Sequence, residues 1–447
     1  MTTPASRTAK RDPMTIALRG LTRLAQAPVL DRWGLRPRAE RTAFHATRIG
    51  MGTATKAARS FARKPAGGAP QRQSTSGGAD LFDLTPSEEQ QMLAEVVREF
   101  AAEQVRPAAD DADRKHATPE GLVAAAAELG MWQLGVPESL GGLTAERSAV
   151  SGVLVAEALA HGDLGLAVAC LAPGSVATAI GLWGSAEQQA TYLPAFVGDA
   201  PPTAALAIAE PVVLFDALAP KTSAVRTAEG WKLTGVKSLV PGAHACELFV
   251  VGATLEGEGG PALFVVEAGA TGLTVEDEPA MGLRGAQTGR VHLDGVVVGA
   301  DARLDGSAGA AAAYRECVRL SRLAWAALAV GTCQAVLDYV VPYVNDRVAF
   351  GEPISHRQAV AFTVSDIATE LAGARLAVLR AAGRLDRGVD ATREIALARS
   401  LASTYGMQIG SDGVQLLGGH GYVREHPVER WYRDLRAVGV LEGVVLV

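Results

Sequence analysis

Cysteine and aromatic residues are scarce in this chain. Its 447 residues include four cysteines, and 5% of all residues are Phe, Trp or Tyr. Cys170, Cys246, Cys317 and Cys333 are widely spaced and form no Cys-x-x-Cys pair, so the sequence predicts neither a zinc site nor a disulfide framework. We expect four buried free thiols and no metal site.

The chain also lacks the segments that direct a protein into or across a membrane. We find no apolar run of the ~18–20 residues that span a bilayer, and no signal-peptide core near the start. The net charge is −6, although residues 1–80 carry 15 Lys and Arg against 4 Asp and Glu. The remainder is therefore acidic, which argues against nucleic acid as a partner. We expect a cytoplasmic protein.

Residues 1–80 form a basic leader that differs in composition from the rest. It closes with the Pro-, Gly- and Ser-rich stretch PAGGAPQRQSTSGGAD, which is typical of a linker. Apolar residues at roughly helical spacing, with arginines between them, are compatible with weak contact with an anionic membrane surface. A loosely ordered extension is the favoured interpretation, because charge asymmetry alone is a weak signal.

Vesicle binding separates these two interpretations of the leader. If it contacts membranes, the full chain binds anionic vesicles more strongly than a chain that lacks residues 1–80, because the basic residues are attracted to anionic lipid. A cosedimentation assay measures the difference. Equal binding of the two chains excludes the membrane interpretation.

From residue 81 the sequence predicts three parts in the order helical, β, helical. Residues 81–202 are rich in helical periodicity, with Thr85 as the first N-cap and Pro86 at the first helical position. Residues 203–305 contain short β-branched segments separated by glycine-rich turns. Residues 306–447 contain long Ala-, Leu- and Arg-rich segments. We predict a mainly helical α+β protein with a small middle β domain and a C-terminal four-helix bundle.

Two long motifs in the C-terminal part carry candidate binding residues. The first, YVNDRVAFGEPISHRQAVAF, contains Arg347, whose planar guanidinium suits a pyrophosphate oxygen. The second, SDGVQLLGGHGYVREHPVERWYRDLR, contains Gly418 and Gly419, which let a ligand approach the backbone closely. His420, inside this glycine cluster, is expected to be a surface or packing residue.

With these motifs, residues 81–447 resemble the acyl-CoA dehydrogenase family. The matches are RxxFGxPIxxxQ and QLLGGxGYxxExPVERxYRD, in the order and spacing of the family. The resemblance implies FAD as cofactor, an acyl-CoA as substrate, an electron-transferring flavoprotein as acceptor, and a homodimer or homotetramer in which the FAD site lies at a subunit contact. The cofactor-binding residues that it implies are Arg347, Phe350, Gln358, Gln415, Gly418 and Gly419.

The resemblance also implies a catalytic base. Family members remove the α-proton of an acyl thioester with a carboxylate while a hydride leaves the β-carbon for flavin N5. In many members the base stands near the C-terminus, which here corresponds to Glu442; other members use an earlier position, which here is Ser321 and cannot serve. Apolar neighbours would raise the pKa of Glu442 towards the operating pH. Arg322 matches an active-site arginine that orients the base or binds substrate.

The middle part departs from the family pattern. Relatives read TEPxxGSD and KxWITN where this chain has AEPVVLFD and KSLVPG, so Ala209, Leu239 and Pro241 replace Thr, Trp and Thr. Val444 replaces the Thr that follows the Glu-Gly pair. Hydroxyl donors expected beside the flavin are therefore missing. Two alternatives to a dehydrogenase stay open: a non-catalytic CoA- or acyl-binding partner subunit, and an oxidase that passes electrons to oxygen.

Overall fold

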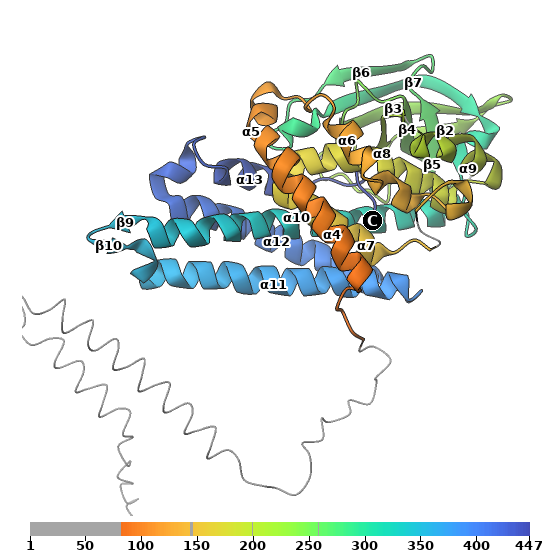
Figure 1. Ribbon diagram of the computed structural model, residues 1–447. Coiled ribbons are helices and arrows are strands. Elements are labelled where there is room, and N and C mark those ends of the chain that lie inside the picture. Colours follow the sequence, from red (N-terminus) through yellow and green to blue (C-terminus); the bar gives the residue numbers. More distant parts are fainter. Residues whose placement is uncertain (1–81, 144–145, 199, 258) are drawn as a thin grey trace, which may run out of the picture. The chain divides into compact units, whose positions relative to one another are not determined.

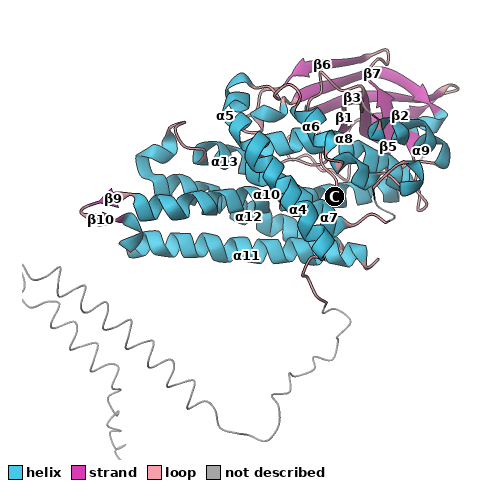
Figure 2. Cartoon of the chain, viewed as in Figure 1, coloured by secondary structure: helices cyan, strands magenta, loops and turns pink. Residues whose placement is uncertain are grey.

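The computed structural model describes residues 82–143, 146–198, 200–257 and 259–447. The basic leader, and the membrane contact predicted for it, lie outside the described residues. In the described part, helices precede and follow a β-sheet (Figures 1 and 2). The predicted mainly helical α+β fold class is confirmed.

The N-terminal helices form a largely apolar layer. Helix α4 begins one residue after Ser87, whose side chain accepts from the Gln90 backbone N–H in a reciprocal capping box. The prediction of Thr85 as N-cap is therefore wrong, because a second hydroxyl two residues further on is matched by a glutamine at the third helical position. The helices are α4 (Glu88–Phe100), α5 (Arg106–Lys115), α6 (Leu122–Glu128), α7 (Ala149–Gly162), α8 (Leu164–Trp183) and α9 (Ala186–Tyr192), with a π-helical turn at Ala101–Val105.

The middle part is one sheet with the strand order β6-β7-β3-β2-β4-β5-β8, and β1 pairs with β4 in parallel. Alternate residues point to opposite faces of a strand. Leu206 and Val250 therefore pack on the helices, while Ala205 and Phe249 belong to a separate core of the sheet. The strands are β1 (Ala204–Ala207), β2 (Ser223–Arg226), β3 (Gly230–Val240), β4 (Leu248–Leu255), β5 (Pro261–Glu267), β6 (Leu273–Asp277), β7 (Gly289–Gly299) and β8 (Arg303–Leu304).

The C-terminal part is built around one long central helix. Figure 1 shows α10, α11 and α12 lying side by side, and α7 also packs on α10 and α11. A short hairpin of β9 (Val348–Ala349) and β10 (Glu352–Pro353) follows α10. The helices are α10 (Ala310–Asp346), α11 (Gln358–Asp386), α12 (Thr392–Leu417) and α13 (Val428–Leu435).

Two of the core helices are as long and apolar as membrane-spanning helices. By length and composition alone, α8 and α10 could each cross a bilayer, so the expectation that no segment reaches this length is wrong. The apolar windows of the two helices are 83% and 72% buried within the fold. Burial between neighbouring helices and the sheet accounts for their composition. All four cysteines are buried and free, as expected.

A buried cluster of charges joins all three parts of the fold. Asp434 on α13 accepts from the Leu283 backbone N–H, 2.6 Å away, between β6 and β7. Arg430 on α13 donates to Asp163 at the start of α8, with Nε and Oδ2 2.9 Å apart. Burial, and then the nearby charge of Asp163, raise the pKa of Asp434 to about 8. The carboxyl group of Asp434 is therefore a protonated bridge between the parts over much of the acidic range.

This cluster predicts that stability falls as the pH rises. The folded-state pKa of Asp434, about 8, lies above the value of about 3.9 expected in the unfolded chain. The contribution of Asp434 to the free energy of unfolding is thus complete below about pH 4 and is lost as the pH rises through about 8. We expect Asp434→Asn to remove this dependence, so that its stability relative to wild type grows by up to about 1.4 kcal/mol per pH unit between pH 5 and 8.

Urea unfolding at several pH values measures the effect on Asp434→Asn, with the exposed Asp294→Asn as a matched control. The asparagine keeps an oxygen that accepts from Leu283, so the hydrogen bond itself survives. If Asp434→Asn and wild type lose stability in parallel as the pH rises, another group is responsible.

Candidate active site and cofactor-binding residues

Glu442 lies against the central helix in an ion pair with Arg322. The Arg322 Nε atom is 3.0 Å from each carboxylate oxygen of Glu442, and Nη2 is 2.8 Å from Oε1. The Glu442 side chain is 14% exposed and that of Arg322 is 32% exposed. We expected apolar neighbours around the carboxylate. In the structure, the Arg322 guanidinium donates hydrogen bonds to both carboxylate oxygens. The predicted base and the predicted substrate-binding arginine are therefore brought together.

The backbone on both sides of Glu442 is fixed by side chains from α10 and α12. The Gly443 carbonyl accepts from Ser321 Oγ at 2.5 Å and from Trp325 Nε1 at 3.0 Å. The Leu441 carbonyl accepts from Arg399 Nη2 at 2.5 Å. Ser321, dismissed as a base, thus holds the segment that carries the carboxylate. Sequence reasoning missed all three contacts, because each links residues at least 42 positions apart.

Close packing by the β domain makes glycine necessary at position 443. Gly443 has φ 75°, and a Cβ atom there would lie 2.6 Å from the Ile208 side chain. Ile208 is held in turn by the fully buried Lys237, whose Nζ donates to the Ile208 carbonyl and to Glu210 at 3.2 and 2.8 Å. Burial lowers the pKa of Lys237 to about 8. The position of Glu442 therefore depends on the β domain as well as on the bundle.

Arg399 is a second cation close to Glu442. Burial lowers the pKa of Arg399 to about 10, which the charge of Glu442 opposes and that of Arg322 reinforces. Its Nη1 atom has no hydrogen-bond partner among the described residues. An unpartnered buried donor is costly unless a ligand or water satisfies it. This donor is a buried polar group beside Glu442 that a ligand or water can satisfy.

The predicted cofactor residues gather at one end of the helical bundle. Arg347 caps the end of α10, Gln358 begins α11, and Gln415 lies in the last turn of α12, just before Gly418 and Gly419. The side chains of all three are exposed.

The exposure and geometry of this end suit a charged ligand. The guanidinium of Arg347 makes no ion pair with another described residue, and Phe350 is 96% exposed. A Cβ on Gly418 or Gly419 would meet no atom within 4 Å, so the backbone is open to a ligand. These groups fit the pyrophosphate and adenosine of a dinucleotide.

The bundle end and Glu442 do not form one site within a single chain. Arg322 and Arg347 lie 25 residues apart on and directly after the same helix, which corresponds to about 37 Å. A cofactor held at Arg347 would therefore not reach the carboxylate paired with Arg322. This separation could have been predicted from sequence, because one helix spans both positions.

The part of the β domain that would face a flavin offers few donors. Ala209 and Pro241 are buried and carry no side-chain donor. The Ser238 backbone N–H donates to the Ala209 carbonyl at 2.9 Å, and the Leu239 N–H donates to Glu278 at 2.6 Å. Neither N–H therefore replaces the missing hydroxyl groups. The residues at the bundle end therefore fit the phosphate and adenosine of FAD better than the β-domain residues fit its ring system.

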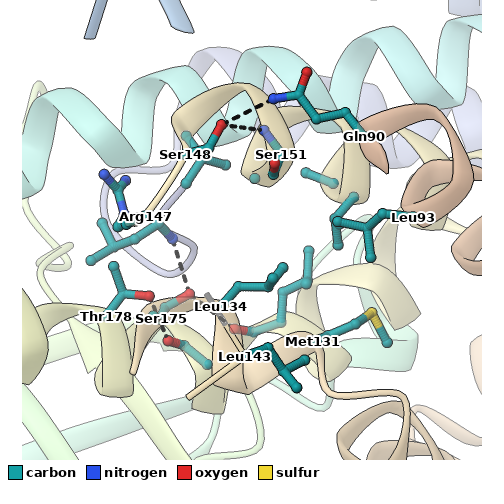
Figure 3. A pocket seen from close by; sticks show the side chains of 18 of the residues that line it. Gln90, Leu93, Met131, Leu134, Leu143, Arg147, Ser148, Ser151, Ser175 and Thr178 are labelled. Atoms are coloured by element: carbon teal, nitrogen blue, oxygen red, sulfur yellow. Dashed lines mark hydrogen bonds between the residues drawn. The ribbon is translucent and has the colours of Figure 1, made fainter. Parts of the chain in front are cut away.

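A cavity of about 560 Å³ lies next to the C-terminal segment (Figure 3). Figure 3 shows the polar side chains of Gln90, Ser148 and Ser151 along one wall and Met131 and Leu143 across from them. Residues 445–447, which follow Glu442 closely, form part of the lining, and the Leu446 N–H donates to Ser175 at 2.9 Å. Its walls combine apolar side chains with polar ones, and the carboxylates of Glu89 and Glu146 are among the polar groups.

The cavity contains one cation. Arg147 lines it, and the Arg147 Nη2 atom is buried without a hydrogen-bond partner among the described residues. Burial lowers the pKa of Arg147. Asp386 is the acid whose charge affects the pKa of Arg147 most. Its carboxylate already accepts hydrogen bonds from Ser148 Oγ and from the first backbone N–H groups of α7. A cavity with apolar walls on one side and one unsatisfied guanidinium suits an acyl chain that ends in an anion.

The fold and the motif residues define an oxidoreductase of three parts. Family models describe the acyl-CoA dehydrogenase N-terminal, middle and C-terminal domains, and they match residues 87–199, 205–296 and 308–445. The chain therefore belongs to the acyl-CoA dehydrogenase family.

Named relatives include both dehydrogenases and reductases. Cyclohex-1-ene-1-carbonyl-CoA dehydrogenase of Geobacter metallireducens is 33% identical, over 80% of this chain and 95% of the relative. Acryloyl-CoA reductase (NADH) of Anaerotignum propionicum is 30% identical, over 81% and 93%. Among solved structures, the FAD complex of PigA has a TM-score of 0.75 and 26% identity, over 81% of this chain and 96% of that one. These relatives do not settle the substrate or the direction of the reaction.

Proposed function

We propose that the protein is an FAD-dependent acyl-CoA dehydrogenase that converts an acyl-CoA to the trans-2-enoyl-CoA. The observation that carries the proposal is the fixed carboxylate of Glu442, held by α10, α12 and the β domain together. Glu442 takes the α-proton, and its ion pair with Arg322 orients the carboxylate. FAD, when bound, supplies the acceptor for the hydride that leaves the β-carbon.

Arg322 has two tasks in this proposal. In the ligand-free chain it orients the Glu442 carboxylate through both oxygens. When substrate is bound, part of this hydrogen bonding must be released so that one oxygen can reach the α-carbon. Because Arg322 is one-third exposed, its guanidinium has room to move towards the substrate. Its assignment as a substrate-binding residue rests on this freedom.

A complete site requires a second copy of the chain. The exposed bundle end with Arg347, Phe350 and the glycine pair lies about 37 Å along the helix from Arg322, so another subunit must supply one of the two halves. We therefore propose a homodimer or homotetramer with FAD at a subunit contact. Electron-transferring flavoprotein is the proposed acceptor, and the cytoplasm is the proposed location.

Anaerobic flavin bleaching tests the function directly. We expect a yellow protein whose flavin absorbance is bleached by an acyl-CoA, and a series of chain lengths identifies the preferred substrate. A colourless protein that takes up no added FAD would favour the non-catalytic subunit, which the missing donors at Ala209, Leu239 and Pro241 support. Peroxide formation in air would reveal the oxidase.

The cavity beside the C-terminal segment supports a proposal for the substrate class. We propose that it receives the distal end of the acyl chain and that Arg147 pairs with a terminal carboxylate. We expect wild type to favour an ω-carboxyacyl-CoA over the unsubstituted acyl-CoA of equal length. Arg147→Met should lower this kcat/KM ratio about 10- to 150-fold, because a hydrogen bond to a charged group contributes about 1.5–3 kcal/mol.

The conservative variant Arg147→Lys keeps the charge and should retain part of the preference. Arg393→Met, at an exposed position on α12, is the control for loss of one positive charge. An unchanged ratio in Arg147→Met would show that the carboxylate binds elsewhere or that the cavity takes another group.

A further inference from the structure

Three possible metal ligands meet at the turn between α12 and α13. One ligand atom each from His420, Glu425 and His426 lies within 4.8 Å of the other two. The first two side chains are exposed and the third is partly buried. This group is not recognisable from the sequence, because the ligands follow no regular spacing and no cysteine pair is involved. The turn of the chain alone brings them together.

The turn that carries these residues is held firmly against the bundle. A Cβ on Gly421 would lie 2.2 Å from the Val414 carbonyl oxygen, so the chain passes directly over the end of α12. Val428, at the start of α13, is fully buried. Both anchors lie within the segment 418–428, Gly421 directly after His420 and Val428 two residues after His426. The backbone positions of the three ligands are therefore set before any ion binds.

The second ring nitrogen of His426 has a hydrogen-bond partner, as metal-bound histidines do. Its Nδ1 atom is 2.6 Å from the hydroxyl oxygen of Tyr339 on α10, and the Tyr343 ring lies edge-on to the imidazole at 5.7 Å. When Nδ1–H donates to the Tyr339 hydroxyl, the neutral ring presents Nε2 as its free lone pair. A hydrogen bond of this kind fixes the orientation of the ring and increases its basicity as a ligand.

His420 and Glu425 form no hydrogen bond with each other that would compete with metal binding. His420 Nδ1 is 3.9 Å from Glu425 Oε2, which is too long for a hydrogen bond and suits two ligands of a common ion. Ligands about 2.0–2.2 Å from a tetrahedral zinc ion lie roughly 3.3–3.6 Å apart. The 3.9 Å between His420 and Glu425 is close to this value, and the larger separations, up to 4.8 Å, must shorten by about 1 Å. Because His420 and Glu425 are exposed, rotation of their side chains is enough.

We propose that His420, Glu425 and His426 form a binding site for a divalent transition-metal ion. Two imidazoles and one carboxylate are ligands that zinc accepts in tetrahedral sites, with water in the fourth position. The site is independent of the proposed reaction. It follows Gly418 and Gly419 directly, so an ion there adds positive charge beside the predicted cofactor-binding end of the bundle.

Metal titration of the full-length protein, freed of metal by chelator and dialysis, tests the site. Calorimetry with Zn²⁺ and the visible absorption of bound Co²⁺ are the readouts. We expect His420→Ala and His426→Ala each to lose the tightest equivalent of metal, with at least about a tenfold fall in affinity. Tyr339→Phe should weaken binding by about 10- to 100-fold without removing a ligand, as expected when a supporting hydrogen bond is lost.

His244→Ala is the matched control, since His244 also faces an acid, with Nε2 2.8 Å from Asp277. It should leave the tightest equivalent unchanged. The proposal is overturned if His420→Ala and His426→Ala bind Zn²⁺ and Co²⁺ as wild type does, or if His244→Ala weakens binding as much as they do. Far-ultraviolet circular dichroism identifies any variant that fails to fold, and Glu425→Gln then replaces it.

Discussion

Glu442→Gln is expected to retain FAD but to lose flavin reduction by acyl-CoA by a factor of about 10²–10⁴, the range for removal of a positioned general base. The amide has nearly the same shape and keeps an oxygen for the Arg322 guanidinium, whose Nη2 is 2.8 Å from Oε1. It cannot accept the α-proton. Anaerobic stopped-flow measurement of flavin absorbance gives the rate of reduction directly.

Glu394→Gln provides a matched control for this loss. Glu394 on α12 also pairs with an arginine, Arg384, with Oε2 and Nε 3.4 Å apart, and its side chain is likewise 14% exposed. The two substitutions therefore remove similar charges from similarly buried pairs. Only Glu442→Gln should affect flavin reduction. A rate within tenfold of wild type in Glu442→Gln would mean that another residue removes the proton.

The order of the three parts was predictable from sequence because each has its own local pattern. Helical periodicity over tens of residues and glycine-separated β-branched segments arise from neighbours along the chain. The N-cap at Ser87 was missed because two hydroxyl residues precede the same helix, and only the reciprocal bond with Gln90 distinguishes them. The apolar length of α8 was missed because Gly, Pro, Ser and Thr interrupt a segment that still has no charged residue.

The surroundings of Glu442 were less predictable. Its apolar sequence neighbours indicated a dry site, but two arginines lie close to it, Arg322 on the carboxylate and Arg399 on the Leu441 carbonyl, and both are at least 43 residues away along the chain. Packing against Ile208 explains why Gly443 follows the carboxylate, and it depends on a third part of the fold. Local patterns carry no information about such long-range contacts, whereas the single span of α10 does predict that Arg347 is distant from Arg322.

Arg347→Ala is expected to weaken FAD binding about 10- to 150-fold, because a hydrogen bond to a charged phosphate contributes about 1.5–3 kcal/mol. Arg347 is exposed and makes no ion pair with a described residue, so its removal should leave the free energy of unfolding nearly unchanged. Flavin fluorescence on dilution measures the release of FAD. Arg393→Ala is the control for lost charge. Unchanged FAD affinity in Arg347→Ala would assign the phosphate to another residue.

Mixing Arg347→Ala chains with Glu442→Gln chains tests whether the two residues act across a subunit contact. If each site takes its carboxylate from one chain and its arginine from another, a mixed dimer contains one intact site and one doubly altered site. Co-expression should then restore activity to about a quarter of the wild-type sites, since half of randomly paired dimers are mixed. If both residues served the same site from one chain, every site would carry a defect and no activity would return. The separation of about 37 Å along α10 predicts recovery.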